Sequence, residues 1–167
     1  MKKGVKILLT VLNFLAVIGL FFFGIAFIFV GLFAEALAVA LTLGYGSADG
    51  QIVAMFTPPA FILFAVSFLV LIATVLFIVT FKKPLKGIQI AAGGVFSLAA
   101  LLVLIAILVL FINIGFEAGN VSAFLVVGLV ALLHVALFVL TAVFGGFIPA
   151  SKKHAAVEEI ETAEEVK

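Results

Sequence analysis

The sequence has 167 residues, of which 67% are hydrophobic and only 10% are charged, and its mean hydropathy is +1.55. Soluble domains are roughly half apolar and about a quarter charged, so this composition excludes a soluble globular protein. All nine basic residues are lysines and cysteine is absent. The chain therefore offers no disulfide, no thiolate metal site and no arginine-rich, aromatic surface for nucleic acid.

Long apolar runs make up most of the chain. A helix needs about 20 apolar residues to cross the hydrocarbon core, and each run meets that length. The first run follows a basic segment, but it is longer than the roughly 7–15 apolar residues of a signal peptide, so we expect an uncleaved anchor. We predict an all-α membrane protein, an antiparallel four-transmembrane-helix bundle within residues 1–150. The predicted spans are about 7–34, 60–81, 87–114 and 121–147.

The predicted connections differ in length. The long outer loop at 35–59 contains a glycine-rich turn, and the following Thr57-Pro58-Pro59 is typical of a helix start, because proline has no amide proton to leave unpaired there. A short loop at 82–86 and a tight turn at 115–120 make the other connections. Residues 151–167 form an acidic tail, predicted to be cytoplasmic.

Lysines gather in three clusters and are absent from the apolar runs between them. Cytoplasmic flanks of membrane spans retain basic residues, and four crossings place all three clusters on one side. We therefore expect both termini and the central loop in the cytoplasm, with Glu35, Asp49 and Glu117 outside, in the inner membrane of a bacterium or archaeon. The topology-determining lysines are Lys2, Lys3, Lys6, Lys82, Lys83, Lys86, Lys152 and Lys153.

The lysine spacing before the first span repeats before the third span, and an outer glutamate follows each. This pattern is compatible with duplication of one hairpin, which would relate the halves by an axis along the membrane normal. Two unrelated hairpins that both obey the lysine rule would look the same. Similar lengths and crossing angles of the two hairpins would favour duplication.

Each predicted span carries polar or small residues on one face, because positions seven or eleven apart return to the same side of a helix. Lipid cannot satisfy polar side chains, so we expect these seams to face one another. They could serve helix packing, with hydrogen bonds across the interfaces, or form a polar pathway. The polar positions are Asn13, Ser67, Thr74, Ser97, His134 and Thr141, and the packing glycines are Gly24, Gly31, Gly93 and Gly145.

His134 lies near the middle of the fourth predicted span, where an ionisable side chain is costly and suggests a function. A neutral imidazole could simply donate to Ser67 or to a backbone carbonyl. The alternative is a proton-responsive switch or relay, since histidine titrates near physiological pH. A metal site is disfavoured, because the spans hold no second histidine, carboxylate or cysteine. Asn113 lies off the seam, and we expect it to bond interface water or the outer loops.

No catalytic set of paired carboxylates or of nucleophile and base is visible, so we expect no enzyme and no cofactor. The sequence favours a small accessory, assembly or scaffold subunit in contact with membrane lipid and with other subunits or further copies of itself. The alternative is a small oligomeric transporter or channel component that uses the polar seam. The acidic tail is either solvated or docks a cytoplasmic partner.

Overall fold

The computed structural model describes residues 3–41, 51–82, 85–114 and 121–147. All regular structure in these ranges is helical, and the four α-helices are each long and apolar enough to cross a membrane. The predicted all-α bundle of four membrane-spanning helices is therefore confirmed, and the pattern is that of a multi-pass membrane protein. The elements are α1 (Lys3–Leu41), α2 (Gln51–Lys82), α3 (Lys86–Ile114), α4 (Val121–Ala142) and the π-helix η2 (Val143–Phe147).

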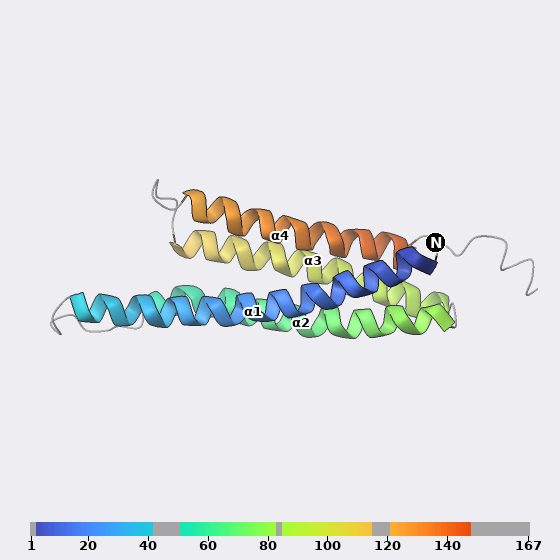
Figure 1. The fold of residues 1–167 in the computed structure, drawn as a ribbon, viewed down its shortest axis with the longest axis horizontal. Helices are drawn as coiled ribbons and strands as arrows, with labels where there is room; N and C mark the ends of the chain where they lie inside the picture. Colours follow the sequence, from blue (N-terminus) through green and yellow to red (C-terminus); the bar gives the residue numbers. More distant parts are fainter. Residues whose placement is uncertain (1–2, 42–50, 83–84, 115–120, 148–167) are drawn as a thin grey trace, which may run out of the picture.

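The helices follow from the apolar sequence, because lipid offers no partner for an unpaired backbone group and a helix pairs those groups internally. Helices α1 and α2 contain 39 and 32 residues, whereas α3 and α4 contain 29 and 22. In Figure 1, α1 and α2 extend beyond α3 and α4 at the end of the bundle where α1 stops. The unequal lengths argue against duplication of a single hairpin.

The predicted outer loop at 35–59 is too long. Helix α1 continues through Glu35 to Leu41, and α2 begins at Gln51, so helical residues occupy both ends of that range. The prediction that Thr57-Pro58-Pro59 begins the helix is wrong, because Pro58 and Pro59 lie inside α2. A carboxylate oxygen of Glu35 accepts a hydrogen bond from the amide of Ile52 at 3.0 Å. An anion at a helix start stabilises that helix, so Glu35, and not the prolines, supplies the start signal of α2.

Helix α2 tolerates Pro59 because a neighbouring side chain replaces the hydrogen bond that this proline cannot make. Pro59 cannot donate to the carbonyl of Met55, four residues earlier. Instead, Nδ2 of Asn113 on α3 donates to that carbonyl at 3.0 Å. The Thr57 hydroxyl donates to the carbonyl of Val53 at 2.7 Å. Asn113 thus bonds a residue of the predicted outer loop 35–59, as expected, but that residue is helical in the structure.

Helix α2 lies at the centre of the packing. It contacts α1 along one side and α3 along another, α3 in turn contacts α4, and α1 touches α4 only over a short stretch. Within the most apolar 18-residue stretch of each helix, 39% of α2 is buried, compared with 22% of α4. The core consists mostly of aliphatic and small residues. Members of this core with at most 2% exposure include Ala60, Leu63, Val66, Val70, Ala73, Ala99, Val103, Ala106, Leu110 and Ala142.

Three buried phenylalanines join α2, α3 and α4. The ring centroids of Phe77 and Phe96 lie 6.5 Å apart, and those of Phe96 and Phe138 lie 6.3 Å apart. Tilted and edge-on pairs at such distances are favourable beyond the area they bury. A Cβ atom at Gly145 in η2 would lie 2.5 Å from the Phe77 ring, so only glycine fits beside it. This cluster fixes three helices at one level of the bundle.

Candidate functional site

Asn13 and Thr141 make a polar contact between α1 and α4. Nδ2 of Asn13 donates to Oγ1 of Thr141 at 3.1 Å, and this hydroxyl donates in turn to the carbonyl of Leu137 at 2.8 Å. Both side chains are 0% exposed. Oδ1 of Asn13 is buried and has no hydrogen-bond partner among the residues that the structure describes. The orientation of the amide is determined by its neighbour, because the Thr141 hydroxyl has given its proton to Leu137 and can only accept.

The remaining seam hydroxyls bond within their own helices. The hydroxyl of Ser67 donates to Leu63 at 2.8 Å and that of Thr74 to Val70 at 2.7 Å. The expectation that these side chains bond across interfaces is wrong for both residues. A hydroxyl can reach the carbonyl one turn earlier on its own helix, so it needs no partner helix.

Ser97 does not face the interior. Its hydroxyl donates to the carbonyl of Gly93 at 3.0 Å, and its side chain is exposed, whereas Gly93 is buried. Residues four positions apart are offset by about 40° around a helix, which is enough to separate the two here. The predicted seam on α3 therefore keeps Gly93 and loses Ser97.

Two predicted glycines bring α1 close to α2. A Cβ atom at Gly24 would lie 2.7 Å from the ring of Phe64. At Gly31 it would lie 3.3 Å from Cβ of Phe56 and 3.4 Å from Cα of Val53. Small residues allow such close approach between membrane helices, and here they place phenylalanine rings against a bare backbone.

His134 is partly buried and faces α1 rather than Ser67. Its Nδ1 lies 2.8 Å from the carbonyl oxygen of Val130, which can only accept, so Nδ1 carries the proton. A Cβ atom at Gly19 would lie 3.6 Å from Nε2. Within the described residues, Nε2 makes no hydrogen bond. The imidazole thus uses one nitrogen for its own helix and turns the other toward α1.

A cavity of about 20 Å³ lies where the four helices meet, with His134 in its wall. This volume is close to the minimum for one water molecule, which would also need two or more polar partners. The rest of the wall offers none. It consists of Leu20, Phe23, Phe27, Leu63, Val103, Ile107, Val127, Val130 and Ala131.

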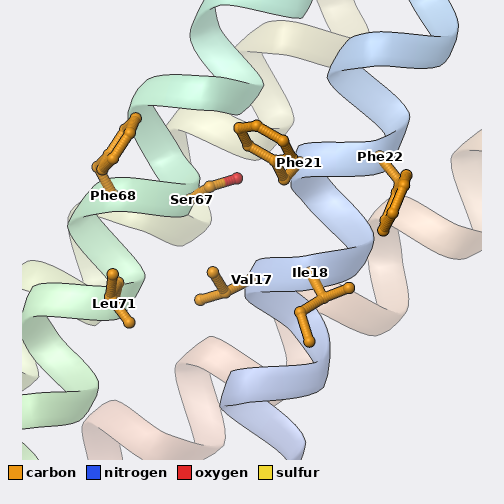
Figure 2. A pocket seen from close by; sticks show the side chains of 7 residues that line it. All are labelled: Val17, Ile18, Phe21, Phe22, Ser67, Phe68 and Leu71. Carbon is orange, nitrogen blue, oxygen red and sulfur yellow. The ribbon is translucent and has the colours of Figure 1, made fainter.

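A larger hollow of about 300 Å³ opens on the surface between α1 and α2. We call it the α1–α2 groove. It lies beside the point where Phe64 packs against Gly24, and its walls are apolar apart from one hydroxyl, which Figure 2 shows directed from α2 toward α1. Its lining residues are Val17, Ile18, Phe21, Phe22, Ser67, Phe68 and Leu71.

Ser67 lies buried at the floor of the α1–α2 groove. The residue is only 3% exposed, and its proton is held by the Leu63 carbonyl. Its oxygen can therefore accept a hydrogen bond but has no proton left to donate. Phe22 and Phe68, at 64% and 61% exposure, form the outer rims of the groove. Such a site suits a mainly hydrocarbon occupant that enters sideways from lipid.

The basic residues lie at helix ends. Lys3 is the first residue of α1, Lys82 is the last of α2 and Lys86 is the first of α3. Lys6 follows one turn into α1. Lys2, Lys83, Lys152, Lys153 and the acidic tail at 151–167 lie outside the described residues, as do Asp49 and Glu117.

No group of three histidine, aspartate or glutamate side chains that could hold a metal occurs in the part of the chain that the structure describes. Comparison with protein-family models, curated proteins and solved structures finds no match.

Sequence reasoning missed the α1–α2 groove, the bond from Asn113 to Met55 and the Glu35 cap on α2. The missing proton on Pro59 was a usable signal for the second of these, since an orphaned carbonyl inside a membrane helix needs a donor nearby. The groove had no comparable signal, because it depends on where α1 diverges from α2.

Proposed function

We propose that this chain is a non-enzymatic accessory or scaffold subunit of a membrane complex, which recognises its partners within the bilayer. The observation that carries the proposal is the way the interior uses its polar groups. Ser67, Thr74 and Thr141 give their protons to carbonyls of their own helices, and Asn13 joins α1 to α4. Groups engaged in this way support packing rather than transport.

The cavity at the centre of the bundle is too small for a polar substrate. The central cavity is about 20 Å³ and mostly apolar, whereas ligand pockets usually measure about 300–1,000 Å³. The outer surface, in contrast, carries many large exposed side chains, including Phe29 at 66% and Phe33 at 72% on α1. Contacts with lipid and with other membrane helices are what such a surface can provide.

We further propose the antiparallel arrangement, with both termini in the cytoplasm of a bacterial or archaeal cell. The contacts support it: Gly24 meets Phe64 and Gly31 meets Phe56, so positions ascend on α1 as they descend on α2. Positions also ascend on α1 as they descend on α4, since Asn13 bonds Thr141 and Gly19 faces His134. The lysines at the ends of α1, α2 and α3 then share one membrane face, as the positive-inside rule requires.

Single cysteines test this topology cleanly, because the chain has no cysteine of its own. We expect a membrane-impermeant maleimide to label Asp49→Cys in intact cells, and Lys86→Cys only after permeabilisation. Leu71→Cys, in the middle of α2, serves as the unlabelled control. Labelling of Lys86→Cys in intact cells would reverse the proposed orientation.

The proposed function is tested by purification from native membranes in mild detergent, followed by native mass spectrometry. We expect a second protein in stoichiometric amount. A homo-oligomer with no other subunit would contradict the accessory role. Substitution of exposed phenylalanines on α1, such as Phe29→Leu and Phe33→Leu, should reduce recovery of the partner, while Leu132→Ala on α4 is the matched control.

One observation favours the alternative of a proton-responsive transporter or channel component. His134 lines the central cavity, and in the described part of the chain neither its Nε2 nor the buried Oδ1 of Asn13 makes a hydrogen bond. If a pathway opens between α1 and α4, these atoms would line it. The test is pH-driven flux in liposomes: His134→Phe should abolish a genuine pH response, and an unchanged response would exclude His134 as the relay.

A further inference from the structure

We propose that the α1–α2 groove binds one acyl chain of an anionic phospholipid. Its headgroup lies among the lysines at the end of the bundle where α1 begins and α2 ends. The groove opens on the exposed surface of two helices that are long and apolar enough to span a membrane. Its occupant must therefore be soluble in lipid. Only Ser67 interrupts the hydrocarbon lining, and it keeps its proton on Leu63.

The size of the groove favours a chain over a helix. Its volume is about 300 Å³, and its lining spans little more than one turn of each helix, from Val17 to Phe22 and from Ser67 to Leu71. A helix with side chains is roughly 10–12 Å across and would rest on the rims rather than enter. Phe22 and Phe68 stand at these rims and can flank a narrow hydrocarbon chain.

The position of the lysines indicates the headgroup charge. At about 1.5 Å rise per residue, Val17 lies roughly 16 Å from Lys6, and Leu71 lies roughly 16 Å from Lys82. One leaflet contributes about half of the ~30 Å hydrocarbon core. The headgroup layer adds roughly 5–7 Å outside the core on each side, so an acyl chain whose phosphate lies level with these lysines extends about 20 Å inward and enters the groove at Val17 and Leu71. No acidic side chain occurs in the described residues between the lysines and the groove on either helix.

The experiment uses the full-length protein in nanodiscs with tryptophan fluorescence, since the natural chain has no tryptophan. Phe68→Trp places a reporter at the rim of the groove. Leu133→Trp on α4 is the control, because Leu133 is 63% exposed, close to the 61% of Phe68, and lies beside His134 at the level of Gly19. The probes are dibrominated phosphatidylglycerol and dibrominated phosphatidylcholine, each mixed with its unbrominated counterpart.

We expect quenching of the groove reporter to show an affinity for phosphatidylglycerol about five-fold higher than that for phosphatidylcholine for each lysine engaged. The control reporter should be quenched equally by the two lipids. Val17→Phe, which fills the groove and keeps every lysine, should remove the preference. Lys6→Gln and Lys82→Gln should each weaken it. Circular dichroism and size-exclusion profiles establish that the variants are folded.

Three outcomes would overturn the proposal. Equal quenching by both lipids at both reporters would mean ordinary boundary lipid only. A preference that survives Val17→Phe would place the lipid outside the groove. Quenching at Phe68→Trp that is weaker than at Leu133→Trp with both lipids would mean that protein, such as a second copy, covers the groove.

Discussion

Helix α1 makes two interfaces of opposite character. Against α2 it packs over most of its length, with Gly24 and Gly31 admitting the side chains of Phe64 and Phe56. Against α4 it touches only briefly, yet this contact holds the bond from Asn13 to Thr141 and the approach of His134 to Gly19. One interface is long and apolar, and the other is short and polar.

The difference between these two interfaces follows from the lipid that surrounds the helices. Lipid is as apolar as leucine, so hydrophobic burial does not drive α1 onto α2, and close packing at small residues must supply the stabilisation. A polar side chain, in contrast, cannot be left in lipid, so one hydrogen bond is enough to define where α1 meets α4. Figure 1 shows that α1 diverges from α2 toward α4 near its N-terminal end. The α1–α2 groove lies between these two helices.

The largest expected effect comes from breaking the apolar interface. Gly24→Leu forces the ring of Phe64 away, since even a Cβ atom would lie 2.7 Å from it. We expect a loss of about 1–3 kcal/mol in the free energy of unfolding, measured in mixed detergent micelles. The matched control is Gly94→Leu on α3, where a Cβ atom meets nothing within 4 Å. An equal loss at Gly94 would show that the effect is not due to packing.

Substitutions at the polar α1–α4 interface should reduce the free energy of unfolding by less. Thr141→Val removes the acceptor for Asn13, and we expect a loss of about 0.6–1.7 kcal/mol in the free energy of unfolding. Asn13→Leu should cost less than Thr141→Val, because it also removes the buried Oδ1 that has no partner. A double-mutant cycle isolates the pair. Additive losses in that cycle would contradict an energetic role for this bond.

The smallest effect is expected at hydroxyls that bond only to their own helix. Ser97→Ala and Thr74→Val should each change the free energy of unfolding by no more than about 0.5 kcal/mol, because neither joins two helices. The same unfolding measurement checks both. A loss at Thr74 as large as that for Thr141→Val would reveal a second cross-helix contact and weaken the contrast between the two interfaces.

Helical periodicity placed some candidate residues in the interior and misplaced others. Asn13 and Thr141 are both buried, but nothing in the sequence pairs them, because they lie on helices at opposite ends of the chain. Ser97 was assigned to the interior with Gly93 although it is exposed. Angular offsets of about 40° decide such cases, and they depend on how each helix is rotated in the bundle.

The start of α2 also could not be placed from local sequence alone. Pro58 and Pro59 have the local chemistry of a helix start, and a local rule cannot know that Asn113 on α3 bonds the carbonyl that Pro59 leaves unpaired. Glu35 is separated from Ile52 by the residues between α1 and α2, so its role as a cap also depends on how these helices meet. Contacts between distant residues overrode the local signal in both places.

The sequence by itself determined the membrane class, the number of spanning helices and the restriction of lysines to helix ends. These follow from the free energy of moving each side chain and each backbone group between water and lipid, which depends on local composition. The tertiary structure alone decided the partner of Asn13, the direction of His134, the bond that compensates Pro59 in α2 and the existence of the α1–α2 groove. Each of these depends on the rotation and crossing of whole helices, and closely similar apolar surfaces permit many arrangements until small residues and single hydrogen bonds select one.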